Sequence, residues 1–118
     1  MQLRLSTRAV VDVVVVDCAG RIVFGDEAAL LRDTVKKLLI ENNRIVFNLA
    51  GINYIDSGGL GTLVALYTSA QTAGGSIKLA NLTKRVGDLL QVTKLVTVFE
   101  VYDNEEQAVQ SFHKGAVA

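Results

Sequence analysis

The chain has 118 residues, of which half are hydrophobic and a fifth are charged, as expected of one globular domain rather than a disordered segment. Twelve basic residues balance twelve acidic ones, so composition gives no reason to expect nucleic acid or an anionic membrane as a partner. The single Cys18 cannot form an internal disulfide, and no Cys or His cluster offers metal ligands, which favours a reducing cytosol.

The start of the chain predicts strands joined by a tight turn. Residues 3–7 and 9–18 are apolar and rich in β-branched side chains, which favours two strands. The triplet AGR at 19–21 is typical of a turn, so we expect a third strand to return over 21–24. The polar first ten residues do not resemble a signal peptide, and no apolar run approaches the roughly 20 residues of a membrane helix.

A helix is predicted over residues 27–42. Leu31, Val35 and Leu38 recur at helical spacing and indicate one face directed into the core. Asp26 is the expected N-cap, and the following pair of asparagines is expected to end the helix.

The middle of the chain predicts a buried strand followed by a second helix. Residues 44–50 form a short apolar run typical of a strand covered on both faces, and GINYI is expected to be a loop. The second helix begins near Gly58 and stops at a glycine pair. Its inward positions are Leu60, Leu63, Val64 and Tyr67.

The last third of the chain repeats this alternation. A strand over 76–80 precedes a short helix capped by Thr83, and residues 97–101 are expected to form a last strand. Asp103 and Glu106 have the spacing of a capping arrangement for a final helix. The resulting order, βββαβαβαβα, predicts an α/β domain with one mixed sheet layered with helices.

The segment NYIDSGGLG, residues 53–61, follows the buried strand, where ligands and partners often meet such a sheet. Serine and aspartate are favoured helix caps, so Asp56 and Ser57 have a structural interpretation in which they only start the helix. A phosphate-binding loop fits poorly, because neither the third glycine nor the lysine of such loops is present. A catalytic serine also fits poorly, because the only histidine, His113, lies near the C-terminus and is expected at the surface. Phosphorylation of Ser57 by another protein requires only an exposed hydroxyl.

The sequence resembles the STAS-domain antagonists of anti-sigma factors over roughly residues 3–113. In that family an apolar strand leads to an Asp-Ser pair and then to Gly-Leu-Gly at the start of a helix. The matching positions are Asn48, Leu49, Tyr54, Ile55, Asp56, Ser57, Gly59, Leu60, Gly61, Gly74 and Gly75. The resemblance implies a single STAS-like domain over 1–118, with about five strands in a mixed sheet and about four helices.

Two departures from the family pattern are visible. Gly58 stands where Ser or Thr is frequent, which leaves Ser57 as the only hydroxyl in the loop. Phe24 and Gly25 stand near positions where a leucine and an acid are common, so contacts made by this first loop are expected to differ.

The resemblance implies a partner-switching protein without catalysis, cofactor or metal of its own. The unphosphorylated form would bind an anti-sigma factor that is a serine kinase, the kinase would phosphorylate Ser57, and a PPM-type phosphatase would reset it. Asp56, Gly58, Gly59 and Thr62 are expected to share the partner surface with Ser57. Asp56 has the alternative role of a turn residue that bonds its own backbone. We expect a cytoplasmic monomer or weak dimer with no direct contact to nucleic acid or membrane.

Two other functions remain open from the sequence. The domain could be a scaffold or accessory subunit of a stress-sensing assembly or a transporter, with Ser57 only a helix cap. It could also be a small hydrolase that uses Ser57 as nucleophile.

Overall fold

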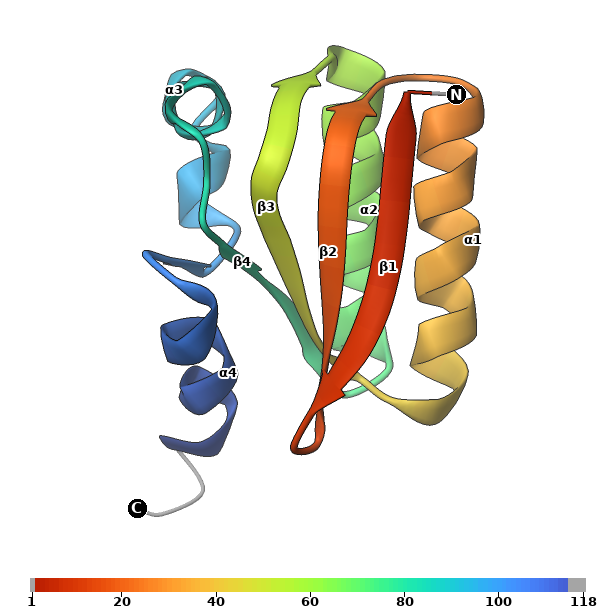
Figure 1. Ribbon diagram of the computed structural model, residues 1–118, viewed down its shortest axis with the longest axis vertical. Helices are drawn as coiled ribbons and strands as arrows, with labels where there is room; N and C mark the ends of the chain where they lie inside the picture. Colours follow the sequence, from red (N-terminus) through yellow and green to blue (C-terminus); the bar gives the residue numbers. More distant parts are fainter. Residues whose placement is uncertain (1, 115–118) are drawn as a thin grey trace.

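The computed structural model describes residues 2–114, which form one five-stranded mixed sheet in the order β1-β2-β3-β4-β5 (Figure 1). β1 runs antiparallel to β2, and every other neighbouring pair is parallel. The elements of the described chain are β1 (Leu3–Val10), β2 (Val13–Ile22), α1 (Asp26–Glu41), β3 (Arg44–Ile55), α2 (Ser57–Thr72), β4 (Ser76–Ala80), α3 (Lys84–Val92), the 3-10 turn η1 (Leu95–Thr97), β5 (Val101–Tyr102) and α4 (Glu105–Lys114).

Helices cover both faces of the central strands, as the apolar run in β3 predicted. Phe47 points to the face that carries α1 and α2, and it belongs to the larger core cluster together with Leu31 and Leu63. The neighbouring Val46 points to the opposite face and packs in a second cluster with Ala108 of α4. Successive side chains of a strand alternate between faces, so a continuous apolar run serves both layers. The expected α/β fold, with five strands and four helices, is therefore confirmed.

The N-terminal hairpin is present, but its turn is not where the sequence predicted it. The chain reverses at residues 11 and 12. Of the strand expected over 21–24, the first two residues are the end of β2 and the last two belong to the loop before α1. Val11 has a φ of 58°, which valine rarely adopts, so composition alone did not indicate the turn. Gly20 lies inside β2, where a Cβ would come within 1.9 Å of the Gln2 carbonyl oxygen. This glycine permits a close contact between two strands rather than a reversal of the chain.

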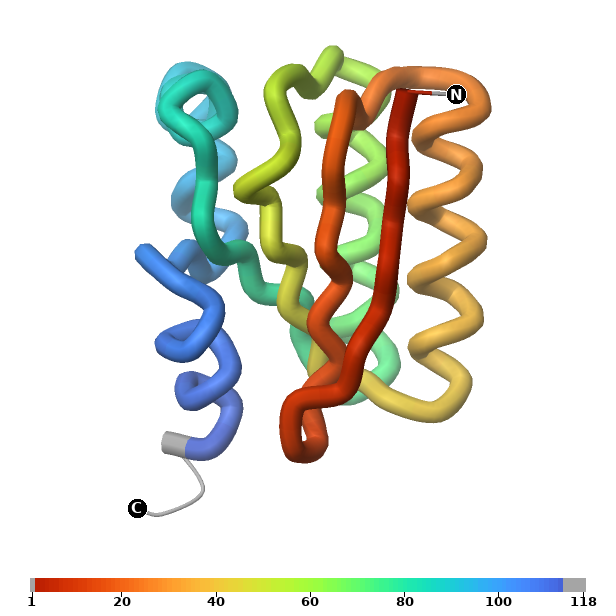
Figure 2. The backbone as a smooth tube through the Cα atoms, viewed as in Figure 1, coloured from red at the N-terminus to blue at the C-terminus, as the bar shows by residue number. Residues whose placement is uncertain are grey.

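β3 is longer than predicted, because the GINYI segment continues the strand and is not a loop. Ile52 and Ile55 are buried, and the end of β3 pairs with the end of β2, with Ile22 opposite Ile55. The sequence did not predict this extension for two reasons. The pairing joins segments that are distant in the chain, and a glycine and two polar residues interrupt the alternation of apolar side chains. As a consequence β2 and β3 end side by side at the same edge of the sheet (Figure 2).

The helices lie close to their predicted positions, but two of them begin differently. Gly25 occupies the N-cap position of α1 without a side-chain hydrogen bond, and Asp26 is the first helical residue. At α4, Asn104 caps the helix and accepts a hydrogen bond from the Gln107 amide at 2.8 Å, in place of the expected Asp103 arrangement. Thr83 caps α3 as predicted.

The last strand is shorter than predicted. β5 comprises only Val101–Tyr102, and residues 95–97 of the segment before it form the 3-10 turn η1. Two residues pair with β4, so the sheet edge is short here.

Candidate functional site

Two loops meet at the edge of the sheet where β2 and β3 end. The loop from β2 to α1 carries Phe24 and Gly25, and the junction of β3 and α2 carries Asp56 and Ser57 (Figures 1 and 2). The Asp56 amide donates a hydrogen bond to the Ile22 carbonyl at 3.3 Å, which joins the two segments. Ser57 therefore lies at the position that the sequence predicted, at the carboxyl end of a central parallel strand.

Asp56 is the N-cap of α2 and also holds the neighbouring loop. Its Oδ1 accepts a hydrogen bond from the Gly59 amide at 2.7 Å, and both carboxylate oxygens lie 3.1 Å from the Phe24 amide nitrogen. These amide donors, Gly59 first and then Phe24, lower the pKa of the Asp56 carboxyl from its ordinary value of 3.8. Asp56 thus bonds nearby backbone, as one interpretation of the sequence predicted. One of its backbone partners, Phe24, lies in the neighbouring loop.

Ser57 is the first residue of α2 rather than its cap. Its side chain is exposed, and within residues 2–114 its hydroxyl has no hydrogen-bonding partner. The capping role considered for Ser57 is therefore wrong, because the preceding aspartate performs it. The fold does not require the hydroxyl, which leaves it available to another molecule.

Gly58 and Gly59 are both closely packed, but against different groups. A Cβ on residue 59 would lie 2.0 Å from the carbonyl oxygen of Ile22, so the backbone that approaches this glycine belongs to β2 and not to a partner. A Cβ on residue 58 would lie 2.6 Å from the Cβ of Phe24 and 3.1 Å from its ring. Gly58 and Phe24, at which the sequence departs from the family pattern, therefore lie against each other.

Beside Ser57 lies a groove between α1 and α2, which we call the Phe24 groove. Its volume is about 400 Å³. Thr62 lies in its wall, where its hydroxyl donates to the Gly58 carbonyl at 3.0 Å. Arg32 is the only ionisable residue that lines it, and within the described residues Arg32 forms no salt bridge. The lining residues are Phe24, Gly25, Ala28, Arg32, Gly58, Gly61, Thr62 and Ala65.

The sequence did not single out Arg32 or the groove. Phe24 and Gly58 were noticed separately, 34 positions apart, and nothing in the sequence paired them. A signal existed in the small residues Gly58, Gly61 and Ala65, whose spacing places them along one side of α2.

The histidine considered as the base for a Ser57 nucleophile does not lie near Ser57. His113 is partly exposed, and its Nε2 lies 2.5 Å from Asp12 Oδ1 beside the hairpin turn. Asp12 precedes β2 whereas Ser57 follows β3, and these strands are parallel, so the two groups lie at opposite ends of the sheet.

Burial raises the pKa of the Cys18 thiol to about 12, which keeps it protonated and unreactive.

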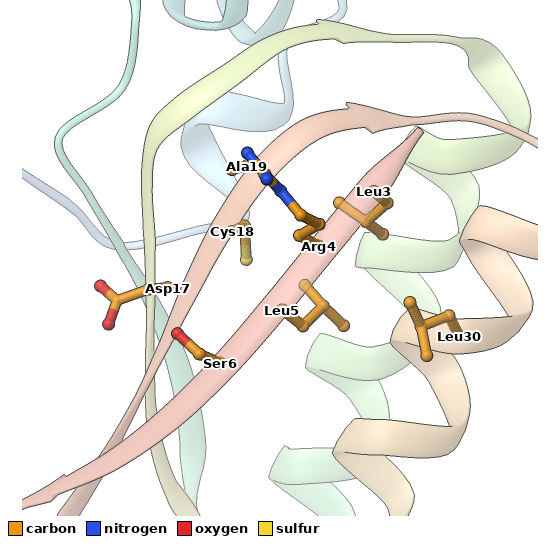
Figure 3. Close-up of a pocket in the computed structure, with 8 residues that line it drawn as sticks. All are labelled: Leu3, Arg4, Leu5, Ser6, Asp17, Cys18, Ala19 and Leu30. Atoms are coloured by element: carbon orange, nitrogen blue, oxygen red, sulfur yellow. The ribbon is translucent and has the colours of Figure 1, made fainter. Parts of the chain in front are cut away.

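A second hollow, of about 560 Å³, lies along β1 on the side of the molecule near α1 (Figure 3). Leu3 and Leu5 of β1 face Leu30 of α1, and the Asp17 carboxylate points away from them. Asp17 forms a salt bridge with Arg8, with 2.7 Å between Oδ2 and Nε.

Nowhere in residues 2–114 do three or more His, Cys, Asp or Glu side chains form a group that could hold a metal. Among these residues there is also no helix whose length and hydrophobicity would let it span a membrane.

The fold and the site together define a small α/β domain that exposes a serine where a helix begins at the carboxyl edge of its sheet. The chain belongs to the STAS domain family, whose model matches residues 4–108. An anti-sigma-B factor antagonist from Bacillus subtilis is 31% identical over 83 residues, which is 70% of this chain and 76% of that protein. The family resemblance seen in the sequence is confirmed.

Solved structures show the same fold in different settings. An anti-sigma factor antagonist from Mycobacterium paratuberculosis superimposes with a TM-score of 0.81 at 18% identity, over 95% of each chain. A murine Solute Carrier 26 family anion transporter superimposes with a TM-score of 0.75 at 16% identity, over 90% of this chain but 18% of that one. The fold therefore occurs both as nearly a whole protein and as a small part of a transporter.

Proposed function

We propose that this protein is an anti-sigma factor antagonist that is switched by phosphorylation of Ser57. The unphosphorylated form binds an anti-sigma factor that is also a serine kinase, and it thereby frees the sigma factor. The kinase then phosphorylates Ser57, and a PPM-type phosphatase removes the phosphate. The anti-sigma factor partner is supported by the named relative from Bacillus subtilis.

The observation that carries the proposal is the free hydroxyl of Ser57 beside a fully engaged cap. Asp56 already accepts the hydrogen bond of the Gly59 amide, and the Ser57 side chain forms no hydrogen bond within residues 2–114. A phosphate on Ser57 therefore breaks no hydrogen bond of that side chain in the described structure. A helix N-terminus also tolerates negative charge. The phosphorylated domain is therefore expected to stay folded, and the effect of the phosphate falls on the partner.

The added charge is large enough to switch binding. A phosphoserine carries about −1.5 to −2 charges. Two unit charges 4 Å apart at an effective dielectric constant of 20 repel by about 4 kcal/mol, whereas about 2.8 kcal/mol lowers an affinity a hundredfold. An acidic partner group opposite Ser57 therefore suffices, and Asp56, Gly58 and Thr62 are proposed to share this contact. The buried Gly59 contributes by letting α2 approach β2.

The test uses the purified anti-sigma serine kinases encoded in the organism that carries this gene. We expect one of them, with ATP, to add a single phosphate, mapped by mass spectrometry to Ser57 and lost in Ser57→Ala. We expect Ser57→Asp to weaken binding of that kinase while the circular-dichroism spectrum stays native. Phosphate transfer to another residue, or unchanged affinity of Ser57→Asp, would contradict the proposal.

A scaffold or accessory role is the rival proposal, and the fold shared with the anion transporter favours it. It predicts a stable large assembly that contains this chain. Size-exclusion chromatography of the native protein distinguishes the two, because a kinase-switched antagonist forms a complex that phosphorylation dissolves.

A further inference from the structure

Phe24 is an exposed aromatic side chain fixed next to Ser57. It is 81% exposed, although large apolar side chains are usually buried. Its backbone amide is held by both oxygens of Asp56, and its side chain lies over Gly58. The two residues that flank Ser57 therefore position the backbone of Phe24 and the base of its side chain.

The Phe24 groove combines small, aromatic and charged residues in a way that suits contact with another protein. Most of its lining residues are small, among them Ala28, Gly61 and Ala65, and they leave space beside the ring. Arg32 is the one charged residue among those that line it, and its guanidinium forms no salt bridge within residues 2–114. An aromatic anchor next to one unpaired arginine is typical of the residues that dominate binding energy at protein interfaces.

We propose that Phe24 is a specificity-determining contact for the anti-sigma factor and inserts into an apolar pocket of that partner, which places an acidic side chain opposite Arg32. The positive charge of the groove selects an acid as its complement, and proximity to Ser57 places the contact within the surface that phosphorylation controls. This inference rests on the proposed function. It adds to it a binding element that remains on the domain whether or not Ser57 carries a phosphate.

The test measures the affinity of the cognate kinase by isothermal titration calorimetry for five proteins: the wild type, Ser57→Asp, Phe24→Ala, Arg32→Glu and Ile40→Ala. Ile40 is the matched control, because it is also an exposed apolar side chain, at 83%, and lies near the C-terminal end of α1, far from the Phe24 loop. We expect Phe24→Ala to raise Kd at least tenfold and Ile40→Ala to change it less than twofold. Arg32→Glu is expected to weaken binding as well, and more strongly at low salt. Circular dichroism checks that each variant is folded.

The outcomes separate this inference from the proposed function. If Ser57→Asp weakens binding but Phe24→Ala binds like the wild type, the role of Phe24 is overturned and the phosphorylation switch stands. An equal loss for Phe24→Ala and Ile40→Ala also overturns it, since the effect would then be general. If the wild type binds none of the kinases, both the proposed function and this inference fail.

Discussion

The side chain of Phe24 occupies the space that a Cβ on Gly58 would need. The closest approach would be 2.6 Å, to the Cβ of Phe24. Because that atom is adjacent to the Phe24 backbone, the ring cannot simply rotate out of the way. With the Phe24 side chain in this position, residue 58 has room only for glycine.

Gly58→Ala is expected to weaken kinase binding about as much as Phe24→Ala, because the new methyl displaces the Phe24 loop and with it the ring. The domain should remain folded, because the overpacking costs about 1–3 kcal/mol and the preference of a helix for alanine over glycine, up to about 1 kcal/mol, offsets part of that cost. The double variant should lose no more than either single variant, because both changes remove the same contact. Calorimetric titration of all three against the kinase measures this coupling. Losses that simply add would show that residues 24 and 58 act independently.

Ser57→Ala is expected to change the free energy of unfolding by less than about 0.5 kcal/mol, as for a surface residue without a structural partner. A helix cap would lose about 1 kcal/mol on the same substitution. Urea unfolding followed by circular dichroism distinguishes the two. A loss in the capping range would contradict the assignment of the cap to Asp56.

Asp56→Asn is expected to reduce stability at neutral pH and to have progressively less effect in acid. The folded state lowers the pKa of Asp56, so its ionised form contributes stability that is fully present above 3.8 and lost as the pH falls through the lowered value. The difference in unfolding midpoint between wild type and variant should thus shrink below about pH 4. The other acidic residues titrate in both proteins, so their effects cancel when the midpoint of the variant is subtracted from that of the wild type. A difference that stays constant between pH 6 and the acid range would exclude an electrostatic role for this carboxylate.

Gly59→Ala and Gly61→Ala are expected to act in opposite directions. A methyl on residue 59 meets the Ile22 carbonyl oxygen at 2.0 Å, and such overpacking costs about 1–3 kcal/mol. A methyl on residue 61 meets nothing within 4 Å and should stabilise α2 by up to about 1 kcal/mol. Thermal unfolding of the two variants provides the comparison. Equal effects would mean that the close approach of α2 to β2 is not what requires Gly59.

The sequence by itself determined the layered α/β class, the four helices and the place of Ser57 at the start of α2. Helical spacing in residues such as Leu31 and Leu63, and the apolar run in β3, are local patterns set by which face meets the core. The exposed hydroxyl followed from its place in the motif after a buried strand.

Only the tertiary structure decided the features that depend on which segments lie side by side. The extension of β3 to Ile55 and the place of Gly20 within β2 come from pairing between strands. Asp56 emerges as a cap that also ties down the Phe24 loop, and the ring of Phe24 explains Gly58. The contacts of Phe24 with Asp56 and Gly58 join residues more than 30 positions apart, and a local pattern carries no information about a neighbour that the chain reaches only after folding.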